Sequence, residues 1–259
     1  MINNNKISVL AAILLICSSA AFAGDGSTAD DYGGVSITHS TSPHNLSATG
    51  PGAGTVGDNG EACVYCHTPH ASNTDFAGAP IWNKATPGGT FDMYGSTVAG
   101  TTTDSAPASP SLACLSCHDG VSAIDSIVNA PGSGMGNLAT GSTTMAQYIT
   151  NTLATELGTA GRGNIGTNLA NDHPVSITYD ATKASLRETS FTLPTTGGGW
   201  LTPGGVNTIA SLLRNGKVEC SSCHDPHNAT GIAQDVSKQV NYLRHTNKQS
   251  ALCFGCHDK

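Results

Sequence analysis

Apolar positions along this chain recur in no long helical or alternating pattern. Two stretches, Met145–Leu157 and Val206–Leu213, are candidates for short helices. Threonine, serine and glycine dominate long tracts of the remainder. The pattern therefore predicts a chain that is mostly coil, with short helices and few strands.

The N-terminal segment carries the features of an export signal. Lys6 precedes the short apolar run Ile7–Ile16, and Ala21–Ala23 forms an A-x-A cleavage site. The run is shorter than the about 20 apolar residues that span a bilayer. We therefore expect a signal peptide over 1–23, a mature domain over 24–259 and no membrane span.

Cleavage before Gly24 would remove Cys17, the cysteine that belongs to no motif. Lipidation of Cys17 is the alternative, but the bulky Ile16 before it disfavours a lipidation site. An exported chain of this kind is expected outside the cell or on its surface, with the periplasm as the alternative location.

The other eight cysteines form four C-x-x-C pairs, each followed at once by histidine. The motifs are Cys63, Cys66 and His67 (first); Cys114, Cys117 and His118 (second); Cys220, Cys223 and His224 (third); and Cys253, Cys256 and His257 (fourth). This spacing is typical of covalent haem c attachment, in which both thiols bind the porphyrin and the histidine binds its iron. The sequence predicts four haem c groups per chain.

Two other uses of paired cysteines are possible. Four C-x-x-C pairs could build two zinc sites of four thiolates each, and cysteines of an exported chain could form disulfides. Neither use explains the histidine that follows every pair, whereas haem attachment requires it.

The amino-acid composition indicates a core that the chain's own side chains do not fill. Aromatic residues make up 5% of the chain and charged residues 11%, with 31 glycines and 12 prolines, so few large side chains are available to fill a core. We therefore expect a tetrahaem c-type cytochrome fold in which mostly coil wraps around a stacked haem chain. The net charge of −7 argues against a nucleic-acid partner.

Six histidines lie outside the motifs: His39, His44, His70, His173, His227 and His245. Four irons need four distal ligands, so there are enough histidines for every haem to be bis-histidine. The three methionines of the mature chain stand in no distinctive setting.

Chain length limits what His70 and His227 can do. Two histidines on opposite faces of one iron need α-carbons about 12 Å apart, whereas three residues span at most about 10 Å. His70 therefore cannot serve the haem of His67, and His227 cannot serve that of His224. Each must bind a different haem or none.

An internal echo relates the two halves of the chain. Residues 63–70 (C-V-Y-C-H-T-P-H) match residues 220–227 (C-S-S-C-H-D-P-H) in form, and a simpler motif follows each of them. The echo indicates two diverged haem pairs around a Thr/Gly-rich middle.

Several runs together resemble one known family: S-P-H-N-L-S at 42–47, A-P-I-W-N at 79–83, C-L-S-C-H-D-G at 114–120, D-H-P-V-S at 172–176, and the first, third and fourth motifs. In this order they are similar to the extracellular multihaem cytochromes of the OmcE type, which polymerise into conductive filaments. The resemblance implies bis-histidine haems in a continuous chain that runs through each subunit into the next.

The resemblance also implies roles for individual histidines. His70 matches best the residue that binds a haem of the neighbouring subunit, and His44, His173 and His227 match the other distal ligands. We expect the fourth motif to hold the haem that receives His70. His39 and His245 lie outside the recognised motifs.

Three functions are open at this point. The chain is a filament subunit conducting electrons to extracellular acceptors, a soluble exported electron carrier, or a multihaem reductase. Full bis-histidine ligation leaves no iron position for substrate, so we expect an electron-transfer protein rather than an enzyme.

Overall fold

The computed structural model describes residues 35–38, 42–47, 62–122, 127–129, 163–195, 199–229 and 242–258. The expected signal peptide over 1–23, the expected helix Met145–Leu157 and His39 lie outside the described residues.

Within the described ranges the chain is mostly coil, as the sequence predicts. The helices are α1 (Ser109–His118), α4 (Ile209–Leu212), α5 (Cys220–Cys223) and α6 (Ala251–Phe254), with 3-10 turns η1 (Pro203–Gly205) and η2 (Lys248–Ser250). The α4 helix lies inside the predicted helix Val206–Leu213 but is only four residues long. No helix in these ranges is long and apolar enough to cross a membrane.

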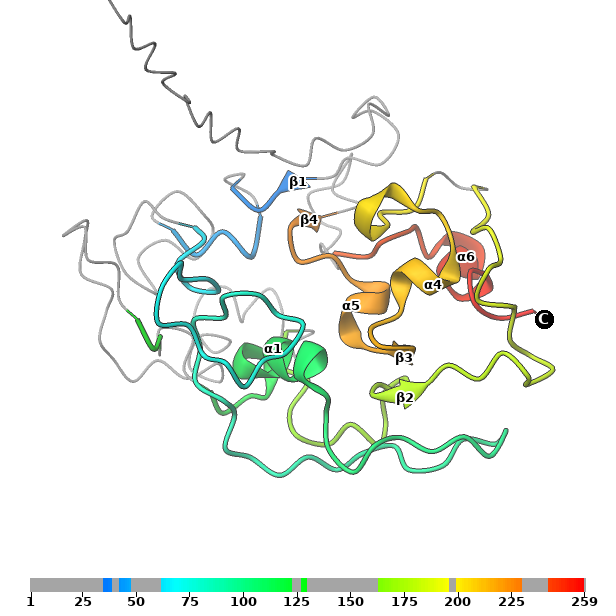
Figure 1. Cartoon of the computed structure of the whole chain (residues 1–259), viewed down its shortest axis with the longest axis horizontal. Coiled ribbons are helices and arrows are strands. Elements are labelled where there is room, and N and C mark those ends of the chain that lie inside the picture. Colours follow the sequence, from blue (N-terminus) through cyan, green and yellow to red (C-terminus); the bar gives the residue numbers. More distant parts are fainter. Residues whose placement is uncertain are drawn as a thin grey trace, which may run out of the picture.

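Two small antiparallel sheets join segments that are distant in sequence. One pairs β1 (Val35–Ser36) with β4 (Asn228–Ala229), and the other pairs β2 (Ile177–Thr178) with β3 (Lys217–Val218). Figure 1 shows the cyan and green part of the chain with α1 on one side, and α4, α5 and α6 grouped on the other. The β1–β4 sheet therefore ties an early segment to the second half of the chain, whereas β2–β3 joins two segments of the second half.

Helix α1 is the longest helix in the described ranges, and its ends follow from its sequence. Pro110 occupies the first turn, where its missing N–H costs nothing. At the other end the Asp119 N–H donates to the Leu115 carbonyl, and Gly120 follows with a φ of +73°. A side chain on Gly120 would collide with Asn164, so the turn after the second motif requires glycine.

The apolar core is divided into small clusters. One consists of Tyr179, Leu193, Ile209 and Leu212, with Cys256 of the fourth motif packed against it. Another cluster among the described residues consists of Phe91, Leu115 and Leu169, of which Leu115 lies inside the second motif. Each cluster therefore packs directly against a C-x-x-C-H turn, which agrees with a chain that has few large side chains of its own.

A buried carboxylate joins the two halves. Glu219 is 1% exposed and accepts hydrogen bonds from Ser111 Oγ in α1 and from Ser176 Oγ, the latter at 3.0 Å. Ser111 Oγ in turn accepts the N–H of Cys220 in α5 at 3.1 Å. Burial raises the pKa of Glu219 above its ordinary value of 4.5, partly opposed by these hydrogen bonds. Glu219 thus holds the second motif against the third.

This joint can be tested by substitution. Glu219→Ala should destabilise the haem-loaded protein by about 2–3 kcal/mol, because it leaves buried serine hydroxyls without their acceptor. Glu219→Gln keeps an acceptor oxygen and should cost less than about 1 kcal/mol. Guanidinium unfolding followed by circular dichroism measures both, and equal stability of the two variants would contradict the assigned role.

The pH dependence gives a second readout on the same variants. An acid with a raised folded-state pKa contributes stability that is complete below its ordinary pKa and is lost as pH rises through the raised value. The wild type should therefore lose stability relative to Glu219→Gln as pH rises from 4.5, the ordinary carboxyl value, towards neutrality.

Candidate functional site

Each C-x-x-C-H motif forms a single helical turn. The second motif ends α1, the third forms α5, and the fourth begins within α6. In the first, third and fourth motifs the histidine N–H donates to the carbonyl of the first cysteine of that motif, at 2.8 to 3.0 Å. One turn brings residues three apart onto the same face, so the two sulfurs of a motif can reach one edge of one ligand.

The alternatives to haem attachment find no support in this arrangement. All eight motif cysteines are free thiols. No three Cys, His, Asp or Glu side chains within the described ranges are grouped as a metal site requires. The four-thiolate cluster of a zinc site is therefore not formed by these cysteines.

The motifs follow one another through space in chain order. Burial raises the pKa of Cys66 to about 12, and the charge of Cys117 in the second motif adds to the rise. The nearby thiol of Cys220 in the third motif, together with burial, raises the pKa of Cys114. Burial raises the pKa of Cys223 to about 12, and Cys256 of the fourth motif contributes. Neighbouring motifs are thus close enough for their thiols to interact.

Three motif histidines each face a histidine from outside the motifs. The ring centroids lie 6.0 Å apart for His44 and His118, 6.1 Å for His67 and His227, and 6.4 Å for His173 and His257. Two imidazoles bound to one metal have ring centres about 6.3 Å apart, given metal–nitrogen bonds of about 2.0–2.1 Å. Every one of the three distances fits an iron between the rings, whatever the angle between the ring planes.

The hydrogen bonds of these rings also favour binding of an iron through Nε2. In four of them Nδ1 lies within hydrogen-bonding distance of a backbone carbonyl: His44 with Pro226 (3.1 Å), His67 with Pro80 (3.0 Å), His118 with Gly163 (2.5 Å) and His173 with Pro174 (3.0 Å). A carbonyl can only accept, so Nδ1 carries the proton and Nε2 keeps its lone pair for a metal. The residues present therefore fit an axially ligated haem iron.

Burial also favours the neutral form of three of these imidazoles. Burial and the neighbouring His118 together lower the pKa of His44 to about 4. Burial likewise lowers the pKa of His118 and of His67. A neutral imidazole is the form that binds a metal, so no proton has to be displaced at neutral pH.

The His44 ring is held from the far end of the described chain. Tyr242 stacks on it with 4.1 Å between ring centroids, and the Tyr242 hydroxyl accepts the His44 N–H at 2.8 Å. The same hydroxyl lies 2.8 Å from Ser42 Oγ, which is 200 residues away in sequence.

The remaining histidines take different positions. His70 is exposed, while its carbonyl accepts hydrogen bonds from Thr68 Oγ1 and Asn129 Nδ2. His245 is 1% exposed and stacks on Trp200, with 4.5 Å between ring centroids and Nδ1 3.3 Å from the Gly199 carbonyl. The structure thus pairs His227 with a motif other than its own, as the reach argument requires, and places His245 against an indole.

Sequence reasoning missed the residues that fasten the motifs. Asn83 donates its side-chain N–H to the Val64 carbonyl at 2.7 Å, and its backbone N–H to the Cys66 carbonyl at 2.8 Å. Arg244 plays a similar part in the third motif, where Nε donates to the Ser221 carbonyl at 2.8 Å. The run A-P-I-W-N at 79–83 could have pointed to Asn83. Arg244 stands in no such run, so the sequence held no sign of its role.

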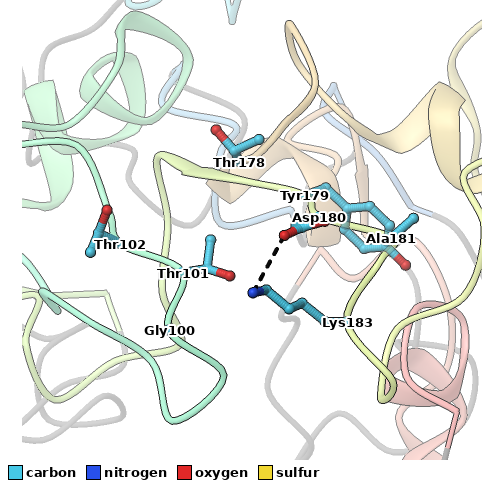
Figure 2. A pocket seen from close by; sticks show the side chains of 8 residues that line it. All are labelled: Gly100, Thr101, Thr102, Thr178, Tyr179, Asp180, Ala181 and Lys183. Atoms are coloured by element: carbon cyan, nitrogen blue, oxygen red, sulfur yellow. Dashed lines mark ion pairs between the residues drawn. The ribbon is translucent and has the colours of Figure 1, made fainter.

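A surface hollow of about 420 Å³ lies apart from the histidine pairs. Figure 2 shows its lining of threonines and the Asp180–Lys183 ion pair, whose atoms are 3.6 Å apart. Tyr179 connects it to the fourth motif, because its hydroxyl donates to the Arg187 carbonyl and lies 3.2 Å from that of Cys256. The hollow is polar and shallow, and we assign no chemistry to it.

Comparison with known proteins agrees with the motif chemistry. Residues 213–259 match the family described as Doubled CXXCH motif, which covers the third and fourth motifs. No curated protein matches the chain. The doubled motif indicates covalently bound haem c, and with it an electron-transfer role of the kind that multihaem c-type cytochromes have.

Proposed function

We propose that the chain carries electrons along four covalently bound bis-histidine haems, as one subunit of an extracellular filament. The observation that supports this best is the order of the motifs, in which thiols of the first and second, second and third, and third and fourth interact. Haems attached to such turns lie close to one another. An electron can then pass along the row without a wide gap.

The ring pairs suggest the axial ligands of three haems. His227 serves the first motif, His44 the second and His173 the fourth, because these are the rings that face the motif histidines at 6.0 to 6.4 Å. The haem bound at each motif would supply the redox chemistry. In two of these outside histidines, His44 and His173, Nδ1 lies against a backbone carbonyl, and bis-histidine ligation leaves no open position for a substrate.

The echo between the two halves suggests the fourth ligand. His44 precedes the first motif and faces the second, just as His173 precedes the third and faces the fourth. His227 follows the third motif and faces the first. By the same rule His70, which follows the first motif, would face the histidine of the third.

That contact would lie between subunits. His70 is exposed within the described part of the chain. As the resemblance to the filament-forming cytochromes implies, His70 then binds a haem of a neighbouring subunit. A repeated contact of this kind builds an open filament. The receiving motif is open between the third, which the echo suggests, and the fourth, where His173 of the same chain already faces His257.

Haem stoichiometry is the first test. Four C-x-x-C-H turns should bind four haems covalently, so the intact mass of the acid-denatured protein should show four haem additions. Haem that extracts into organic solvent, or fewer additions, would contradict the proposal.

Ligand assignment is the second test. His173→Ala should convert one haem of the four to high spin, since one iron loses its axial ligand. The matched control is Lys183→Ala, because Lys183 lies in a surface ion pair with Asp180 and should leave all haems low-spin. Visible and electron paramagnetic resonance spectra give the count. An unchanged spectrum for His173→Ala would remove His173 from the ligand set.

Polymerisation is the third test. His70→Ala should keep four covalent haems, lose one low-spin signal and give short or no filaments in electron micrographs. His70→Ala combined with His173→Ala should show two high-spin haems if the two residues serve different motifs, but one if both serve the fourth. Normal filaments with four low-spin haems would exclude His70 as the bridge and turn attention to His39.

A further inference from the structure

Three of the motifs are each paired with a three-residue segment from elsewhere in the chain, which we call a clamp segment. The clamp segments are 81–83 at the first motif, 242–244 at the third and 185–187 at the fourth. The middle residue of each forms an antiparallel bridge with the motif histidine: Trp82 with His67, Leu243 with His224, and Leu186 with His257. The three contacts are therefore built alike, although the segments share no sequence.

Two backbone hydrogen bonds flank each of these histidines. The third residue of the clamp segment donates its N–H to the carbonyl of the second cysteine, at 2.8 to 3.0 Å. The carbonyl of the first residue accepts the N–H of the residue that follows the histidine, at 2.7 to 3.0 Å. The backbone on both sides of the histidine is thus fixed to one segment.

The side chain of the third clamp residue adds a bond at the same place in each motif. It donates an N–H to the carbonyl of the residue after the first cysteine: Asn83 Nδ2 to Val64 at 2.7 Å, Arg244 Nε to Ser221 at 2.8 Å, and Arg187 Nε to Phe254 at 3.1 Å. A short helical turn leaves its last carbonyls without partners inside the helix, so these donors stabilise the turn from outside. The second motif ends the ten-residue helix α1 instead, and the preceding turns of that helix support it.

Two of the three donors are arginines, and each also pairs with the aspartate that follows the motif histidine. Arg244 Nη1 lies 3.4 Å from Asp225 Oδ2, and Arg187 Nη2 lies 3.1 Å from Asp258 Oδ1. Each guanidinium group therefore spans its motif from the first cysteine to the histidine end. Arg244 is buried, whereas Asp258 is exposed, and an exposed ion pair contributes little. The third motif is accordingly held more strongly than the fourth.

We propose that Arg244 and Arg187 are positioning residues that keep the histidines of the third and fourth motifs on their irons, through the hydrogen bond that each Nε–H donates to the turn. The inference rests on the proposed function, in which these motifs carry haem. Thioether bonds hold only the cysteines, so the histidine leaves the iron if the backbone around it moves. The arginine opposes that movement because it ties both ends of the turn to one side chain.

The experiment is a cyanide titration of the ferric four-haem protein, because cyanide occupies the iron position that an axial histidine gives up. Arg244→Met removes the N–H donor. It should lower, at least about tenfold, the cyanide concentration that half-saturates one haem of the four, and leave the other three unchanged. Tenfold corresponds to about 1.4 kcal/mol, which is of the order of one hydrogen bond. Arg187→Met should act in the same direction on a second haem, with a smaller change.

Arg244→Gln is the matched control. Glutamine carries its amide nitrogen on Cδ, where arginine carries Nε, so this variant loses the same charge as Arg244→Met but keeps the donor. It should bind cyanide as the wild type does. If Arg244→Met fails to accumulate, Arg187→Met and Arg187→Gln at the half-buried site give the same comparison.

Three results would overturn the inference: a methionine variant with an unchanged cyanide response, a glutamine variant that matches the methionine variant, or a shift shared equally by all four haems. The first removes the role, the second assigns it to charge or volume, and the third indicates general loosening of the fold. A wild type without four low-spin haems would instead contradict the proposed function, so the two failures are distinguishable.

Discussion

An imidazole that binds a metal through Nε2 keeps its proton on Nδ1, and a hydrogen-bond acceptor for that proton fixes the orientation of the ring. Four histidine rings direct Nδ1 to backbone carbonyls of Pro80, Gly163, Pro174 and Pro226. None of these carbonyls belongs to a helix or strand, where it would be engaged in a regular ladder. Irregular backbone therefore supplies the carbonyls that orient these four rings, and a more regular fold would offer fewer such acceptors.

The sequence predicted the haem attachment chemistry better than it predicted which residues lie next to one another. Cysteine and histidine spacing identified the attachment turns, and the scarcity of large side chains predicted a chain of mostly coil. Which outside histidine faces which motif was not predictable, because the pairs depend on contacts between segments far apart along the chain. Arg244 was missed for another reason. Its charge marks it as a surface residue, and only the packing of neighbouring segments buries it.

In each half of the chain a tryptophan packs against a histidine near a motif, but the packing geometry differs. In the first half an indole, Trp82, packs edge-on against the ring of His67, with 5.5 Å between centroids. In the second half Trp200 lies flat on His245, and a side chain on Gly255 of the fourth motif would collide with it. One aromatic residue thus braces a motif in each half. Such divergence is what duplicated units accumulate when each must fit a different neighbour.

The stack of Tyr242 on His44 has a consequence for how the protein is made. A ribosome completes the first and second motifs long before it reaches Tyr242, so the ring of His44 has no support from this tyrosine while the early segments emerge. The β1–β4 pairing delays the N-terminal segment in the same way. The ring of His44 therefore gains its stacking partner, and β1 its partner strand, only once the second half of the chain is available.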